Sequence, residues 1–102
     1  MYWNINDEER LYQAFELANN RQLLIDLLFD LLTENELEQC KLRLKAVCLL
    51  HDGASYTQIT KATKLSPTVI ARLSKLLKEK NSGLLQIIKK FLLKGHGEAY
   101  FD

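Results

Sequence analysis

The chain has 102 residues, of which 47% are hydrophobic and 26% are charged, with one Pro and four Gly. This length suits a single domain, 1–102, with one core, and the apolar content is typical of a folded protein, which argues against intrinsic disorder. The composition is rich in Leu, Lys and Glu, and no strand-like alternation persists for more than a few residues, so we expect an all-α fold.

The formal net charge of +1 conceals an uneven distribution of charge along the chain. Residues 1–38 hold nine acids and two bases, a balance of −7, whereas residues 39–102 hold twelve bases and four acids, a balance of +8. A basic C-terminal portion favours a polyanionic partner such as DNA. Charge complementarity within the molecule is the alternative interpretation.

Cysteine spacing and the lack of a long apolar run bear on the cellular compartment. Cys40 and Cys48 fall in one expected helix, about 12 Å apart along its axis, too far to form a disulfide with each other. They lack the spacing of a zinc site, and we expect buried free thiols in a reducing, cytoplasmic environment. The stretch 23–32 is too short to span a membrane and contains two acids, and no signal peptide is expected.

The expected helices begin with two N-terminal segments, 7–17 and 21–32. The second has an apolar band wide enough for burial on more than one side. Thr33 and Glu36 have the spacing of a capping box at the start of a central helix, 33–53, which includes a Gly C-cap signal. This central helix is apolar on two sides, more than one short chain covers, so we expect a homodimer in which residues 1–32 supply dimerisation helices.

Residues 55–77 form the most informative stretch of the chain. Ser55 and Gln58 have capping-box spacing at a first short helix, and Ser66 and Pro67 suit the N-cap and first position of a second. The second helix repeats apolar residues at helical spacing and leaves small, hydroxylated and basic residues on its other faces. This pattern is typical of a helix-turn-helix, although two short amphipathic helices also occur as plain structural elements of all-α domains.

The remaining segments carry no catalytic constellation. A loop and a C-terminal helix, 83–94, follow, and a polar tail spans 95–102. His51 and His96 have neither a paired nucleophile nor the spacing of metal ligands, and no phosphate-binding glycine loop is present. We therefore expect no enzyme, no metal site and no bound cofactor.

The order of motifs within residues 32–77 resembles the Trp repressor superfamily, and most closely its YerC/YecD-like branch. A Leu-Thr helix start is followed ten residues later by Arg43, and the apolar central helix ends in the step Asp52-Gly53. A Ser-Tyr-x-x-Ile bracing helix then precedes a recognition helix that contains Ile70-Ala71-Arg72. The resemblance implies a six-helix fold, an intertwined homodimer, and a repressor that binds operator DNA through the major groove.

The resemblance divides the candidate DNA contacts into two classes. The residues expected to face base edges are small or hydroxylated: Ser66, Pro67, Thr68 and Ala71. The residues expected to contact phosphates are basic: Lys61, Lys64, Arg72, Lys75 and Lys78. Lys64 stands where these turns usually carry Gly, so the sequence predicts either a strained turn or a different one.

The family's effector pocket is matched only in part. Thr33, Arg43 and Arg72 are present at its positions, whereas Leu73 and Leu76 replace a small residue and a Ser. Leucines there would fill the space of an indole, so we expect that L-tryptophan is not the corepressor. Two alternatives to DNA binding stay open: a helical dimerisation or interaction module, and a sensor whose unknown effector binds at Thr33, Arg43 and Arg72.

Overall fold

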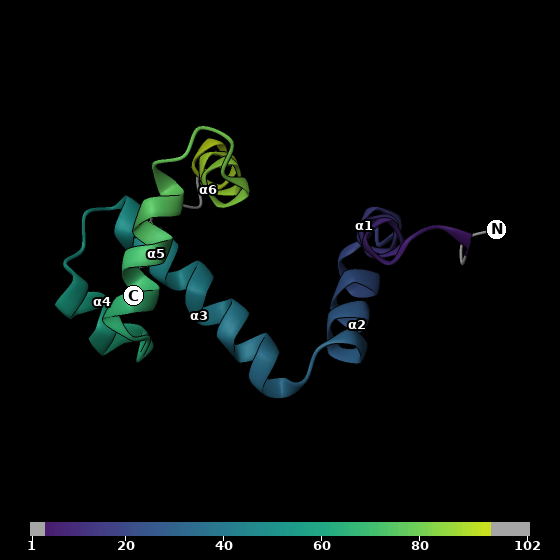
Figure 1. Ribbon diagram of the computed structural model, residues 1–102, viewed down its shortest axis with the longest axis horizontal. Coiled ribbons are helices and arrows are strands. Elements are labelled where there is room, and N and C mark those ends of the chain that lie inside the picture. Colours follow the sequence, from purple (N-terminus) through teal and green to yellow (C-terminus); the bar gives the residue numbers. More distant parts are fainter. Residues whose placement is uncertain (1–3, 95–102) are drawn as a thin grey trace. The chain divides into compact units, whose positions relative to one another are not determined.

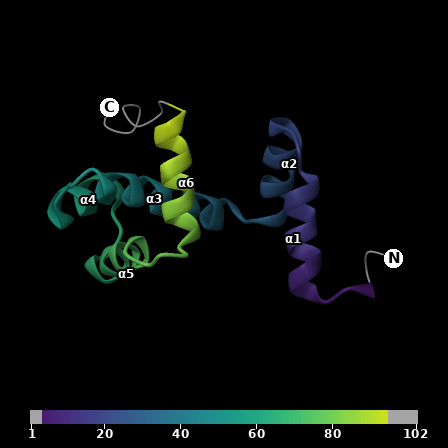
Figure 2. The same cartoon turned by 90° about the horizontal axis from the view of Figure 1, so that it is seen from above.

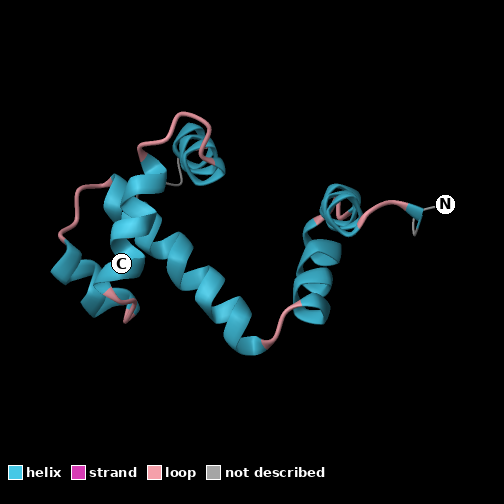
Figure 3. Cartoon of the chain, viewed as in Figure 1, coloured by secondary structure: helices cyan, strands magenta, loops and turns pink. Residues whose placement is uncertain are grey.

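The computed structural model describes residues 4–94, so the predicted tail over 95–102 lies outside the described residues. Within the described range the chain is helical and contains no strand, which confirms the predicted all-α class (Figure 3). The order of its six helices also agrees with the six-helix fold that the resemblance implies. They are α1 (Asp7–Leu17), α2 (Arg21–Leu31), α3 (Glu34–His51), α4 (Tyr56–Thr63), α5 (Pro67–Leu77) and α6 (Gly83–Leu93).

The chain divides into two compact units, Met1–Leu37 and Glu38–Asp102. That one domain spans all 102 residues stays a prediction. No helix among the described residues is both long enough and apolar enough to cross a lipid bilayer.

The first unit contains α1 and α2, and each begins at an asparagine cap. Asn6 accepts a hydrogen bond from the Glu9 amide (2.7 Å), and Asn20 accepts one from the Leu23 amide (2.8 Å). Neither helix has a buried residue in the single chain, so the expected burial of α2 on more than one side is wrong at this level. Phe29 of α2, for example, is 63% exposed. The apolar band exists, but nothing within the described chain covers it enough to bury a side chain.

The long helix α3 changes character along its length. Its start is the predicted capping box, in which the Thr33 amide donates to Glu36 (2.9 Å) and the Glu36 amide donates to the Thr33 hydroxyl (3.1 Å). Beyond its end, Gly53 adopts a positive φ of 87°, as the C-cap signal predicts. Apolar residues of the C-terminal half are buried, whereas Leu44 is 40% exposed. Cys40 is exposed as well, so the expectation of two buried thiols holds only for Cys48.

The core of the second unit lies where the C-terminal half of α3 meets α4, α5 and α6 (Figures 1 and 2). Helix α5 contacts both α4 and α6. The buried apolar residues of this cluster are Ala46, Val47, Cys48, Leu49, Ile59, Leu65, Ile70, Leu73 and Ile88. Every helix of the unit contributes to this cluster, so α4 and α5 are fixed to one shared framework.

Helix α6 begins one residue before the predicted 84–93 stretch, at the start of the committed range 83–94. Ser82 is its N-cap and accepts a hydrogen bond from the Leu85 amide (3.2 Å). The serine is itself buried, at 9% exposure, so the loop after α5 is held close to the core at this point.

Candidate nucleic-acid interface

Helix α4 is fixed at its N-terminus by both halves of a capping box. The Gln58 amide donates to the Ser55 hydroxyl (3.1 Å), and the Ser55 amide donates to the Gln58 side chain (2.8 Å). Ile59, which is fully buried, anchors the helix to the core. Two of the otherwise unpaired amides of the first turn are thereby satisfied, which stabilises a helix of only eight residues.

Helix α5 begins as the sequence predicts and presents a defined face. The Ser66 hydroxyl accepts from the Val69 amide (3.2 Å), and Pro67 takes the first helical position, where its missing N–H group is no disadvantage. Ile70 and Leu73 are 0% and 2% exposed. Because these two side chains fix the rotation of the helix, its other face is held toward solvent.

The exposed face of α5 carries the residues predicted to face bases. Ser66, Pro67, Thr68 and Ala71 are all exposed. They occupy the N-terminal half of the helix, which is the part that a helix-turn-helix directs into the major groove. Their side chains are short, so the helix backbone can approach base edges closely.

The turn between α4 and α5 has a left-handed corner at Lys64, with φ 60° and ψ 11°. It is the only residue other than glycine with a positive φ in the described part of the chain. Its amide donates to the Thr60 carbonyl (2.8 Å) and so closes α4. Of the two predicted outcomes, a strained turn or a different one, the structure shows the strained one.

The free-energy balance at this corner disfavours lysine relative to glycine. A side chain in the left-handed region costs about 1–2 kcal/mol. A cation at a helix C-terminus such as that of α4 returns about 0.3–1 kcal/mol at an exposed site. The first term exceeds the second, so Lys64 stands at a position where local structure prefers another residue.

Buried neighbours hold this corner in place. Thr63 is 1% exposed, and Leu65 is 6% exposed. The Thr63 hydroxyl donates to the Ile59 carbonyl (2.7 Å) and accepts from the Leu65 amide (3.2 Å). Our sequence analysis missed this role of Thr63, although a threonine four residues after Ile59 can bond back to that carbonyl.

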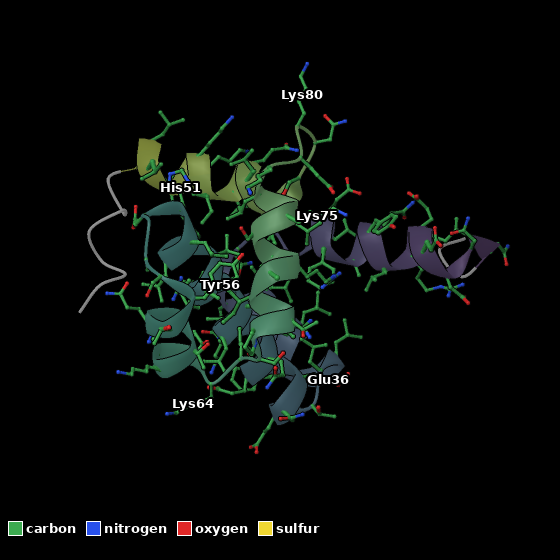
Figure 4. The ribbon with its side chains drawn as sticks, turned by 60° about the vertical axis from the view of Figure 1, so that its left-hand side comes forward. Glu36, His51, Tyr56, Lys64, Lys75 and Lys80 are labelled. Carbon is green, nitrogen blue, oxygen red and sulfur yellow. The ribbon has the colours of Figure 1, made fainter. Side chains whose placement is uncertain are left out.

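The predicted phosphate contacts are distributed over both helices and the turn. All five of them, Lys61, Lys64, Arg72, Lys75 and Lys78, are exposed. Within residues 4–94, ion pairs join Arg10 to Asp7 and Lys41 to Glu38, and none involves these five cations. Figure 4 shows Lys64 at the turn before α5 and Lys75 farther along that helix, with Lys80 beyond its far end. The chain contains no acid between Gly53 and Lys78, so this surface is uniformly basic.

The residues of the expected effector pocket are exposed in the single chain: Thr33, Arg43 and Arg72. The Thr33 hydroxyl is engaged as the cap of α3. The backbone amide of Thr33, and secondly its side chain, hydrogen-bond the Glu36 carboxylate and lower the pKa of that carboxyl below its ordinary value. Leu73 belongs to the hydrophobic core, and Leu76 is half-buried against it.

Other ionisable and hollow features lie at the end of α3. Burial, and secondly the charge of Asp52, raises the pKa of the Cys48 thiol, so this thiol is less reactive than a free one. An open hollow of about 380 Å³ lies at the junction of α3 and α4, lined by Leu49, Asp52, Gly53, Ala54, Gln58 and Ala62. Among the described residues no three His, Cys, Asp or Glu side chains are grouped to hold a metal ion.

Comparison with known proteins gives one match. The model of the family described as Trp repressor protein matches residues 7–92, a range that contains all six helices except the last residue of α6. No curated protein and no solved structure matches the chain significantly.

Proposed function

Because the chain belongs to the Trp repressor protein family, a family of helix-turn-helix DNA-binding regulators, we propose that it is a sequence-specific transcriptional repressor. It acts in the cytoplasm, and it binds operator DNA through the major groove as a homodimer. The observation that carries the proposal is the surface of α5. Its N-terminal half exposes short side chains, and exposed cations surround them on α4, the turn and α5.

In this proposal the two classes of side chain have separate tasks. Thr68 donates or accepts a hydrogen bond at a base edge, and the Ala71 methyl group contacts a thymine methyl group. Ser66 and Pro67 place the end of the helix close to the bases. The five cations hold the protein on the phosphates and set its orientation without reading sequence.

The homodimer is supported by apolar surface that the single chain leaves open. Helices α1 and α2 have no buried residue, and each exposes large apolar side chains. These include Leu11, Tyr12, Phe15 and Leu17 of α1, and Leu23, Phe29 and Leu31 of α2. Contiguous apolar surface on a soluble chain marks an interaction site. A second copy supplies the matching surface and a second α5 for a two-fold operator.

We propose that L-tryptophan is not the effector of this protein. Leu73 and Leu76 are the supporting residues, since an aliphatic side chain at each replaces the small and hydroxylated residues expected around an indole. Any other effector at Thr33, Arg43 and Arg72 would shift the melting temperature of the protein when added in excess over its dissociation constant. A screen of free amino acids and nucleotides against the melting temperature tests this point.

The primary experiment is a fluorescence-anisotropy titration of random-sequence duplex DNA at two salt concentrations, with the oligomeric state measured by light scattering. The proposal predicts a dimer whose affinity falls steeply with the logarithm of the salt concentration. Operator selection from a random library then yields a preferred two-fold sequence. A dimer that binds no duplex even at low salt would contradict the proposal, and would favour the alternative of a helical interaction module.

A further inference from the structure

The left-handed corner at Lys64 is a local violation that the rest of the fold does not require. We infer that Lys64 grips a phosphate of the DNA backbone next to the start of α5, and that the turn retains a lysine for this contact at the expense of stability. The inference rests on the proposed function and deepens it. It assigns one residue a specific ligand, and it explains a backbone outlier.

The backbone of the turn does not need this side chain. Thr63 and Leu65 are buried on either side, and the Thr63 hydroxyl and the Leu65 amide are joined by a hydrogen bond. The corner amide already closes α4 on the Thr60 carbonyl. All of these interactions are made by main chain or by neighbouring side chains, so glycine at position 64 preserves each of them and relieves the left-handed strain.

Electrostatics also disfavours a lysine here in the free protein. Lys64 precedes the positive N-terminal end of α5, two residues before the cap Ser66. Lys61 lies one turn earlier on α4, and no acid occurs between Gly53 and Lys78. Within the described residues Lys64 has neither an ion pair nor a side-chain hydrogen bond. A nearby polyanion reverses every one of these unfavourable terms.

The position of Lys64 suits a phosphate contact. Its side chain is exposed at the turn (Figure 4), immediately before the residues expected to face bases. When a recognition helix enters the major groove by its N-terminal half, the turn before it passes close to one backbone strand. Strained residues that persist in a well-determined structure are concentrated at functional sites, which is the direction of inference used here.

The test compares Lys64→Gly, Lys64→Arg and a control, Lys80→Gln, in the full chain. Lys80 is an exposed lysine beyond the far end of α5 (Figure 4), so its replacement lowers the net charge equally without touching the turn. The readouts are the melting temperature and the affinity for random-sequence duplex DNA at 50 and 200 mM salt.

Lys64→Gly is expected to melt a few degrees higher, about 2–5 °C, because the relief of strain outweighs the greater freedom of glycine in the unfolded chain. Its DNA affinity is expected to fall, and the salt dependence to become shallower by about 0.9 per protomer. Fourfold more salt therefore weakens its binding about threefold less per lost contact. Lys64→Arg is expected to keep both the wild-type affinity and the wild-type salt slope.

Four results would overturn the inference. The first is wild-type affinity and slope in Lys64→Gly while the wild type binds DNA normally. The second is an equal loss in Lys80→Gln, since net charge alone would then explain the effect. The third is a melting temperature of Lys64→Gly at or below that of the wild type. The fourth, no salt-dependent binding by the wild type, removes the proposed function itself and is thereby distinguished from the other three.

Discussion

The amide of Leu65 donates a hydrogen bond to the hydroxyl of Thr63 across the left-handed corner of the helix-turn-helix, at 3.2 Å. Both residues are buried, and the same hydroxyl donates back to the Ile59 carbonyl at 2.7 Å. One side chain therefore satisfies a buried amide of the turn and binds that turn to α4. The angle between the two helices of the candidate DNA-reading unit depends on this bridge.

Replacing Thr63 with Val tests the bridge directly. Valine has nearly the same shape but no hydroxyl, so the buried Leu65 amide loses its partner, at a cost of about 1–3 kcal/mol. Chemical denaturation monitored by circular dichroism measures the loss. Thr60→Val is the matched control, because Thr60 lies on the same helix and no side-chain hydrogen bond of its hydroxyl is seen among residues 4–94. An equal effect of both substitutions would show that the bridge adds nothing.

The capping box of α3 predicts a dependence of stability on pH. The folded pKa of Glu36 lies below its ordinary value of 4.5, because the Thr33 amide and then its side chain favour the carboxylate. A lowered folded pKa means that this stabilisation is fully present above 4.5 and is lost as the pH falls through the folded pKa. Glu36→Gln keeps an acceptor for the Thr33 amide but cannot titrate.

Two measurements check this prediction. An NMR titration of the Glu36 carboxyl is expected to give a midpoint below 4.5 in the wild type, and a higher midpoint in Thr33→Ala. Denaturation at several pH values is expected to give Glu36→Gln a weaker acid dependence than the wild type. A Glu36 midpoint at or above the ordinary value would contradict the capping geometry.

The exposed apolar surface of α2 predicts the effect of a charge on self-association. Phe29 is 63% exposed in the single chain, and its aromatic ring is the type of side chain that anchors interfaces. Phe29→Lys is expected to weaken the proposed dimer at least about thirtyfold, or about 2 kcal/mol, as measured by light scattering over a dilution series. Gln22→Lys is the control on the same helix, since Gln22 is exposed and polar. A dimer of unchanged affinity in Phe29→Lys would place the interface elsewhere.

Helix positions were predictable because their signals are local. Thr33 with Glu36, and Ser55 with Gln58, each form hydrogen bonds within four residues, so spacing alone identifies them. The face of α5 was predictable for a similar reason. The helical period assigns Ile70 and Leu73 to the core, and the exposed residues follow from geometry.

Burial outside α5 was harder to predict because periodicity does not say what covers an apolar face. Cys40 and Cys48 are on the same apolar stripe, yet only Cys48 is near α4, α5 and α6 in the folded core. The apolar band of α2 led to the same error. The left-handed corner was predictable as a problem at Lys64, but the Thr63 bridge that holds it depends on burial that spacing does not reveal.

Lys75 is expected to contribute affinity without sequence preference. Its side chain is exposed on α5, and Lys75→Gln removes one cation from the proposed phosphate contacts. We expect weaker binding to every duplex and a salt slope lower by about 0.9 per protomer. Titrations of a selected operator and of random duplex are expected to show the same proportional loss. A loss confined to the operator would assign Lys75 to base reading instead.

Thr68 is expected to behave in the opposite way. Thr68→Val keeps the volume of the side chain but removes the only hydroxyl on α5 that the proposal aims at a base edge. The loss of that hydrogen bond is expected to relax discrimination at one base pair in each half-site by about 1–3 kcal/mol. Binding to random duplex and its salt slope are expected to stay at the wild-type values, because no phosphate contact changes. Operator selection with wild type and variant in parallel, followed by titration of operators that differ at single base pairs, measures the change. Identical preferences in the two selections would mean that Thr68 does not face a base, and a parallel loss on random duplex would mean that it holds the backbone.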